Sequence, residues 1–327
     1  MSARSAALRS LFIRHVVRAG AVLVVVSWLV FAATALAPGD AFGEARLERT
    51  LSPDAIAALR HAEGLDRPLL VRYARWLQSA AHGDFGRSIA YRAPIAPLVA
   101  QRAVNSLLLV AAALIVTWTI VLPLGVWTAA RDRSTDGRIV AAGATALIAV
   151  PDLLIAIVLV LVAARSGVLP TGGLRAAGGA DAAGFAAIAD RIRHSFLPVL
   201  ALTLIAAPPL VRHVRASLLD ALASPYVLAA AARGIPYRRR LWRSALRAAA
   251  NPLVSLFGLS FAALFSASMM VEVVMSWPGL GPLLLDAVRT RDEQVILAGV
   301  VLATALLLVG NSCADLLLRS IDPRISA

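Results

Sequence analysis

This 327-residue chain offers few residues whose type and spacing could do covalent chemistry. Ser260 could act as a nucleophile, but a serine nucleophile needs a base such as histidine. The five histidines are His15, His61, His82, His194 and His213. None of them lies inside a later apolar run, and the His-Glu-x-x-His pattern of zinc peptidases does not occur. The sequence therefore predicts no catalytic or metal-binding residue.

Two carboxylates are more informative because they stand within apolar runs long enough to cross a bilayer. Asp152 follows Pro151 near the middle of one run, and Glu272 lies near the outer end of another. A carboxylate at such a depth is costly, so Asp152 suggests an interior path or a paired charge. The alternative for Asp152 is a neutralised or hydrogen-bonded packing aspartate beside a proline kink. Taken by itself, Glu272 can be an interfacial charge that reaches out to water.

The chain contains no lysine, since all 32 of its basic residues are arginines. A P-loop needs a lysine to reach the phosphates, so this chain cannot be a Walker-type ATPase by itself. Schiff-base chemistry is excluded for the same reason. The single cysteine, Cys313, permits neither an internal disulfide nor a cysteine metal cluster.

The elements that position these residues are predicted to be membrane helices. The chain is 59% hydrophobic and only 16% charged, with a mean hydropathy of +0.77, which is typical of a polytopic membrane protein. Six apolar runs approach the ~20 residues needed to cross a bilayer. They are 19–37, 104–130, 139–164, 196–211, 252–275 and 295–318. We expect an all-α membrane protein with six transmembrane helices, the fourth being bent or partly interfacial because it contains three prolines.

The placement of the arginines predicts the orientation. With a cytoplasmic N-terminus, the inner side holds 17 of the 32 arginines and only four acidic residues. The predicted organisation is a cytoplasmic N-terminus (1–18), an uncleaved first transmembrane helix (19–37), an extracytoplasmic helical segment (38–103) and a core with five further helices (104–327). Both chain ends are expected in the cytoplasm. Because the arginines bracket the apolar runs, nucleic-acid binding is not expected.

The extracytoplasmic segment is expected to hold two helices. The first begins at Ser52-Pro53 and ends by Gly64. The second is capped by Asp66 and ends at Gly83. It carries an apolar stripe whose spacing favours packing on the rest of the protein. The members of this stripe are Leu69, Leu70, Tyr73, Trp76 and Leu77.

The cytoplasmic segment 212–251 carries the clearest local signals. Ser224-Pro225 can begin a short helix that Gly234 ends, and a second, arginine-rich helix is expected over 237–249. The first helix is too short to be stable alone, and its four central alanines suit insertion into a groove of another protein. The alternative is an ordinary basic loop that follows the positive-inside rule.

These residues resemble one known family. Segments 226–235 and 246–252 resemble the "EAA" loop of ABC-importer permeases, and Arg233 keeps the positive charge of the lysine usual in that loop. The resemblance covers nearly the whole chain and is strongest to the B-type subunit of the dipeptide/oligopeptide/nickel permeases. Further matching strings include Leu36-Ala37-Pro38-Gly39-Asp40, Gly83-Asp84-Phe85-Gly86-Arg87-Ser88, Glu272-Val273-Val274-Met275-Ser276-Trp277-Pro278-Gly279-Leu280-Gly281 and Arg291-Asp292.

The resemblance implies a type I ABC-importer permease fold and two functional regions. The first is a coupling helix that docks on an ATPase, with Tyr226, Ala230, Ala232, Arg233 and Gly234. The second is a translocation path or gate, with Pro151, Asp152, Glu272, Trp277, Pro278, Gly279 and Gly281. Trp277-Pro278-Gly279 is also expected to supply an aromatic interface anchor and a sharp turn.

The implied function is that of a non-enzymatic permease subunit in the bacterial plasma (inner) membrane, which imports short peptides or a related small solute. The implied partners are a second, homologous permease subunit, two cytoplasmic ATP-binding subunits, an extracytoplasmic solute-binding protein and membrane lipid. ATP and Mg²⁺ would bind to the ATPase subunits, and this chain would bind no cofactor. The alternative is an ion-coupled secondary transporter in which Asp152 and Glu272 carry protons, although the inverted repeats typical of that class are not visible.

Overall fold

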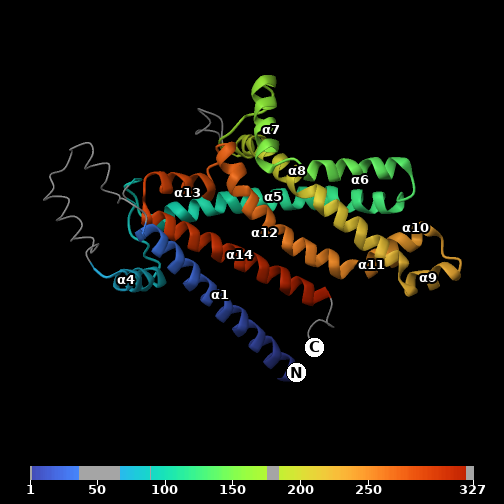
Figure 1. Cartoon of the computed structure of the whole chain (residues 1–327), viewed down its shortest axis with the longest axis horizontal. Coiled ribbons are helices and arrows are strands. Elements are labelled where there is room, and N and C mark those ends of the chain that lie inside the picture. Colours follow the sequence, from blue (N-terminus) through green and yellow to red (C-terminus); the bar gives the residue numbers. More distant parts are fainter. Residues whose placement is uncertain (1, 37–66, 89, 175–183, 322–327) are drawn as a thin grey trace. The chain divides into compact units, whose positions relative to one another are not determined.

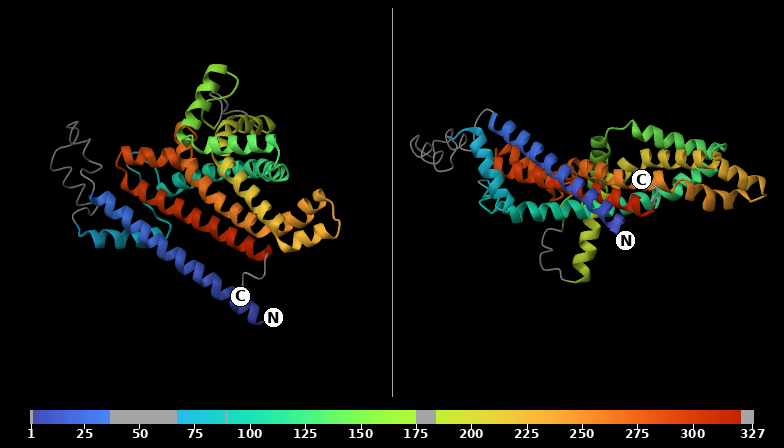
Figure 2. Two further views of the ribbon diagram at one scale, coloured as in Figure 1. Left: turned by 45° about the vertical axis from the view of Figure 1, so that its right-hand side comes forward. Right: turned by 90° about the horizontal axis from the view of Figure 1, so that it is seen from below.

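The computed structural model describes residues 2–36, 67–88, 90–174 and 184–321 (Figures 1 and 2). Helices dominate the described residues, in which the only β contact is an isolated bridge between Arg87 and Pro94. The predicted all-α class is therefore confirmed. The chain forms two compact units, one of Met1–Asn105 and Gly279–Leu308, the other of Ser106–Pro278 and Val309–Ala327.

In the first unit, α4 (Leu69–Ala81) packs against α1 (Ser2–Leu36) through aromatic side chains (Figure 1). The ring of Tyr73 lies edge-on to Trp28 and Phe31, at centroid distances of 5.0 and 5.5 Å. Its hydroxyl also donates to the carbonyl of Val24 at 3.1 Å. The predicted packing role of this stripe is thus confirmed for Tyr73. The predicted cap Asp66 and the predicted helix 52–64 lie outside the described residues, and Pro68 precedes α4.

The rest of the first unit joins the start of α5 (Ile95–Ala130) to α13 (Leu280–Arg289) and α14 (Glu293–Ile321). The sequence did not predict α13. It ends with Arg291 in the left-handed region, at φ 54°, and Asp292 then caps α14. Because so few residues separate α13 from α14, the two helices are joined by a tight turn.

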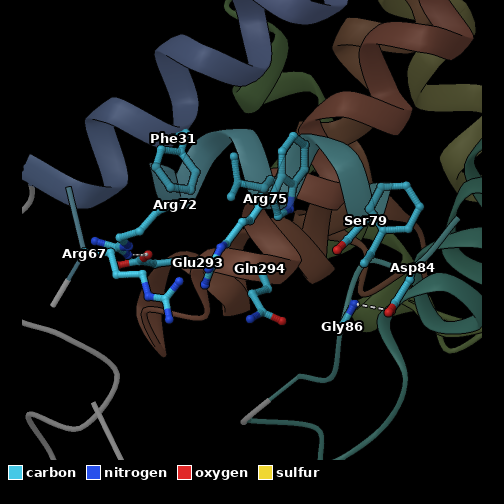
Figure 3. Close-up of a pocket in the computed structure, with 12 residues that line it drawn as sticks. Phe31, Arg67, Arg72, Arg75, Ser79, Asp84, Gly86, Glu293 and Gln294 are labelled. Atoms are coloured by element: carbon cyan, nitrogen blue, oxygen red, sulfur yellow. Dashed lines mark hydrogen bonds and ion pairs between the residues drawn. The ribbon is translucent and has the colours of Figure 1, made fainter. Parts of the chain in front are cut away.

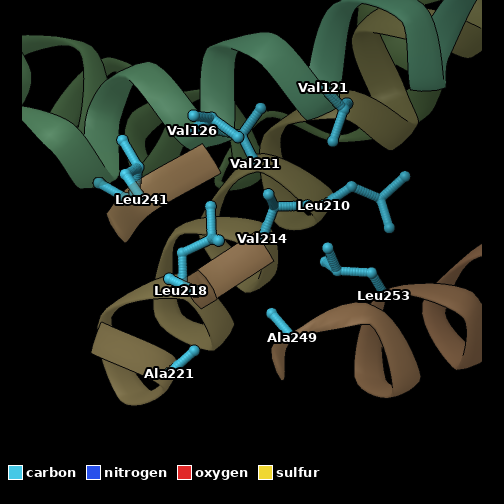
Figure 4. Packing of buried hydrophobic residues seen from close by; sticks show 12 residues of the cluster. Val121, Val126, Leu210, Val211, Val214, Leu218, Ala221, Leu241, Ala249 and Leu253 are labelled. Carbon is cyan, nitrogen blue, oxygen red and sulfur yellow. The ribbon is translucent and has the colours of Figure 1, made fainter. Parts of the chain in front are cut away.

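The second unit is built around α5, α8 (Phe185–Ala223) and α12 (Ala250–Val274). Their apolar side chains meet those of η2, a π-helical segment over Arg240–Ala245 (Figure 4). The buried members of this cluster are Val121, Val126, Ala129, Leu210, Val211, Val214, Leu218, Ala221, Leu241, Ala245, Ala249 and Leu253. A hydrogen bond of 2.8 Å from Trp118 Nε1 to Ser260 Oγ also ties α5 to α12.

The third predicted transmembrane helix is not continuous. It is divided into α6 (Thr135–Ile148) and α7 (Asp152–Ser166), which are bent by 99° at the intervening residues. Pro151 explains the break, because proline has no backbone N–H and restricts the residue before it. Among the described residues, five other helices are long and apolar enough to cross a membrane, and the bent pair brings the number to six where it is counted as one span.

The fourth predicted span also differs from expectation. Instead of a short segment over 196–211, α8 extends over Phe185–Ala223 and runs through Pro198, Pro208 and Pro209. Half of its most apolar stretch is buried inside the protein, the largest share among the candidate spans. Contacts with α6, α7 and α12 surround it, and such packing allows a membrane helix to retain internal prolines.

Candidate coupling surface and gate

The predicted coupling helix is present as α9 (Pro225–Ala232). Pro225 occupies its first turn, where a missing N–H costs nothing. The helix ends in a Schellman motif, because the N–H of Gly234 donates to Ala231 and that of Ile235 donates to Ala230. Gly234 has a φ of +78°, and a Cβ placed on it would meet nothing within 4 Å. Glycine is therefore required there for its backbone conformation rather than for space.

The two faces of α9 have different environments. Val227 and Ala230 are buried, at 0% and 2% exposure, on the side that packs against α8 and η2. Tyr226 and Leu228, in contrast, are 59% and 54% exposed. Ala230, which the resemblance placed among the docking residues, therefore contacts this chain itself. Tyr226, Ala232, Arg233 and Gly234 are exposed, as docking requires.

The expected arginine-rich second helix is interrupted. It consists of α10 (Tyr237–Arg239), the π-helical η2 and α11 (Leu246–Ala248). A π-helical insertion adds a residue to the turn, and such insertions are frequent at functional sites. Here Leu241, Ser244 and Ala245 face the core, whereas Trp242 is 54% exposed.

We call the exposed side chains of α9, its C-cap Arg233, α10, η2 and α11 the coupling surface. Its apolar members are Tyr226, Leu228, Tyr237 and Trp242. Its exposed basic members are Arg233, Arg238, Arg239, Arg243 and Arg247. Exposed apolar side chains together with arginines are a composition that suits binding of an acidic partner protein.

Three of the predicted gate residues, Glu272, Trp277 and Pro278, lie at or directly after the end of α12. Glu272 is fully buried, so the interpretation of an interfacial charge in water is wrong. Trp277 is 2% exposed, which likewise contradicts an aromatic anchor in the membrane interface. The predicted sharp turn is present, since Ser276 has a φ of 50° and the Trp277 N–H donates to the Glu272 carbonyl at 2.8 Å.

Gly172 lies against this turn and was not among the site residues predicted from the sequence. A Cβ on Gly172 would lie 2.5 Å from the carbonyl oxygen of Met275, so only glycine allows this contact between two backbones. The loop after α7 is thereby held against the end of α12. The string Pro170-Thr171-Gly172-Gly173 is the only signal of such a turn in the sequence.

The other predicted gate residues belong to the beginnings of α13 and α7. Gly279 and Gly281 are buried within the first unit, at the start of α13. Asp152 is the first residue of α7, and Pro151 precedes it. Both are exposed, so Asp152 is neither in the middle of a straight span nor a buried packing aspartate. Its role in the path remains a prediction.

The serine-nucleophile hypothesis does not fit Ser260. Its hydroxyl accepts the Trp118 indole N–H at 2.8 Å and donates to the Phe257 carbonyl at 2.7 Å. The side chain is also 4% exposed. Ser260 therefore joins two helices.

Two family models match this chain. The "binding-protein-dependent transport system inner membrane component" model matches residues 121–327, and the model of the N-terminal part of such components matches residues 8–119. The chain belongs to this family. It is thus an ABC-importer permease, and the ion-coupled alternative is set aside.

Curated relatives of this permease are transport proteins for peptides. The oligopeptide transport system permease protein AppB of Bacillus subtilis is 34% identical over 80% of this chain and 82% of its own. The oligopeptide permease OppB of Mycobacterium bovis is 30% identical, and the glutathione permease GsiC of Escherichia coli is 33% identical. Each of these two alignments covers 93% of this chain and 94% of the relative.

A solved structure supports the fold. The inward-facing MetNI methionine ABC transporter contains a chain that matches this permease with a TM-score of 0.56 at 18% identity. The match covers 68% of this chain and 96% of the other. The predicted type I importer permease fold is therefore confirmed.

Proposed function

We propose that this permease forms half of the translocation path of an ATP-driven importer, and that α9 couples it to a separate ATPase subunit. The proposal rests on the contrast between the buried and the exposed side chains of α9. Val227 and Ala230 fix its inner face on α8 and η2, while Tyr226 and Leu228 stay exposed. A short helix fixed in this way must move with the helices that carry it, as a coupling element requires.

The same proposal defines the partners. Because the chain has no lysine for a Walker motif, two cytoplasmic ATPase subunits would bind ATP and Mg²⁺, and this chain would bind no cofactor. A second, homologous permease would complete the path as a heterodimer, and an extracytoplasmic solute-binding protein would deliver the solute. The arginine asymmetry supports a bacterial inner-membrane orientation with both chain ends and α9 in the cytoplasm.

We propose short peptides as the transported solute. The names of the relatives AppB, OppB and GsiC, which refer to oligopeptide or glutathione transport, support this class. Nickel complexes and other small solutes are the alternatives within the resemblance. Competition of unlabelled dipeptides, longer peptides and nickel against uptake of one labelled peptide distinguishes them.

The docking proposal is tested by co-expression with candidate ATPase subunits. The wild-type permease should co-purify with one of them, and Leu228→Ala should weaken that complex about tenfold, as removal of a buried interface anchor does. The matched control is Leu108→Ala on α5, because Leu108 is 52% exposed and Leu228 is 54% exposed. The control should retain full ATPase affinity.

Two substitutions test the position of Gly234, one that suits its backbone conformation and one that is both strained and bulky. Asparagine tolerates the left-handed conformation, so Gly234→Asn should retain ATP-driven uptake. Gly234→Trp adds a large side chain to the coupling surface and should abolish it. Equal uptake by both variants, or uptake by the permease without any ATPase, would overturn the proposal.

A further inference from the structure

The first unit contains a pocket of about 300 Å³ lined by both charged and aromatic side chains, and its lining includes no residue of the coupling surface or predicted gate. Its walls come from the end of α1, from α4 and the turn after it, and from the beginning of α14 (Figure 3). Its lining residues are Phe31, Arg67, Arg72, Arg75, Trp76, Ser79, Asp84, Phe85, Gly86, Glu293, Gln294 and Leu297.

The lining carries three arginines against two acids, so its formal charge is positive. Arg72 already has partners within the protein, because its Nη2 lies 3.4 Å from Glu293 Oε2 and its guanidinium lies over the ring of Phe31. Arg67 and Arg75 have no ion pair with an acid in the part of the chain that the structure describes, and both are exposed. Figure 3 shows the three arginines gathered around the first residues of α14.

Two polar side-chain atoms of the pocket lining are buried without a hydrogen-bond partner among the described residues. They are the indole nitrogen of Trp76, which carries an N–H, and the side-chain oxygen of Gln294. A buried donor without an acceptor is unfavourable, and natural proteins seldom keep one without a reason. An anion in the pocket would accept the Trp76 hydrogen bond and pair with the neighbouring guanidinium groups.

The position of the pocket points to the source of the anion. Phe31 lies near the end of the candidate span Val16–Leu36, and Glu293 begins the candidate span Glu293–Ala314. On α4, Leu70 and Leu77 are 69% and 37% exposed on one flank, whereas the arginines lie on the other. A helix with an exposed apolar flank and a basic flank is typical of the membrane surface, where phospholipid head groups are the abundant anions.

We propose that this pocket binds the phosphate of an anionic phospholipid. The phosphodiester carries one negative charge, which balances the net charge of the lining. Arg75 and Arg67 would pair with its oxygens and Trp76 would donate the indole N–H, while the acyl chains follow the exposed leucines of α4. The bound lipid would then fix α4 and the first turn of α14 at one membrane surface.

The full-length permease, purified with the subunits that accompany it, is titrated with dioleoyl phosphatidylglycerol and followed by native mass spectrometry. The wild type should bind one lipid saturably. Arg75→Gln should weaken binding about tenfold, and Trp76→Phe, which keeps the packing but removes the N–H, about fivefold. The matched control is Arg289→Gln, an exposed arginine of the same unit outside the pocket, and it should not change the affinity.

Three results would overturn the proposal. Equal affinity of wild type, Arg75→Gln and Trp76→Phe would show that the lipid binds elsewhere. Displacement of the lipid by equimolar inorganic phosphate would identify free phosphate as the ligand. If the Arg75→Gln permease bound the lipid as well as the wild type but bound the solute-binding protein more weakly, the ligand of the pocket would be an acidic side chain of that protein. None of these readouts depends on the ATPase, so they are independent of the docking proposal.

Discussion

The carboxylate of Asp292 stabilises two segments of the first unit that lie 204 residues apart in the sequence. Its Oδ1 accepts the Val295 N–H at 3.3 Å and so caps α14. Its Oδ2 accepts the Ser88 hydroxyl at 2.6 Å and the Ala90 N–H at 3.3 Å. The side chain is 2% exposed, so water cannot replace these bonds. Asp292 therefore holds the segment before α5 against the start of α14.

The cost of removing this carboxylate follows from its hydrogen bonds. In Asp292→Asn the amide oxygen can still cap α14, but its NH₂ group cannot accept the Ala90 N–H and the charge is lost. Hydrogen bonds to a charged group contribute about 1.5–3 kcal/mol, so we expect a loss of about 2 kcal/mol. Asp292→Ala also removes the cap and strands buried donors, which raises the expected loss to about 3–5 kcal/mol.

The measurement is unfolding of the detergent-solubilised permease, followed by intrinsic tryptophan fluorescence. Asp220→Asn is the control, because Asp220 undergoes the same change on an exposed part of α8. Ser88→Ala should cost at least about 1 kcal/mol in the wild type and much less in Asp292→Asn, since the partner is then altered. Equal effects of Ser88→Ala in both backgrounds, or equal stability of Asp292→Asn and Asp220→Asn, would refute this role of Asp292.

Two further predictions concern charge. Asp152→Asn, at the exposed start of α7, should raise the KM for peptides with a free amino terminus about fivefold, because about 1 kcal/mol of attraction is lost. The KM for N-acetylated peptides should not change. An equal rise of both KM values would exclude a contact between Asp152 and the amino terminus. The pKa of Tyr91 is raised by burial and by the nearby carboxylate of Asp286. Asp286 Oδ2 accepts a hydrogen bond from the Tyr91 hydroxyl at 3.3 Å. The stabilising contribution of the Tyr91 hydroxyl is fully present below about pH 10 and is lost as the pH rises through the raised pKa. The wild type should therefore be more stable than Tyr91→Phe at neutral pH, and this difference in the free energy of unfolding should shrink at high pH. A difference that does not change with pH would contradict the raised pKa.

The features that could be predicted from the sequence are those with local causes. The ends of α9 follow from Ser224-Pro225 and Gly234, and the structure places the helix over Pro225–Ala232. The fifth predicted span, 252–275, differs from α12 (Ala250–Val274) by at most two residues at either end. In both cases a continuous pattern and its own stop signal lie within one short stretch of chain.

The features that could not be predicted depend on contacts between distant segments. Hydropathy alone cannot show that Pro151 divides one apolar run into helices 99° apart, because both halves remain apolar. Whether Glu272 is buried or reaches water is decided by the helices around α12. The pocket was missed for the same reason, since Arg75 and Gln294 lie far apart in sequence and meet only after folding.

The packing of the second unit explains how a movement of α9 could reach the spans. Leu241 and Ala245 of η2, against which α9 packs, belong to the same buried cluster as residues of α5, α8 and α12 (Figure 4). Close-packed side chains cannot absorb a displacement of several ångströms locally, because any gap forfeits dispersion contacts and leaves a cavity. A shift imposed on the coupling surface must therefore either break this cluster or move these helices together. The second course keeps the core intact, so a rigid-body response is the less costly one.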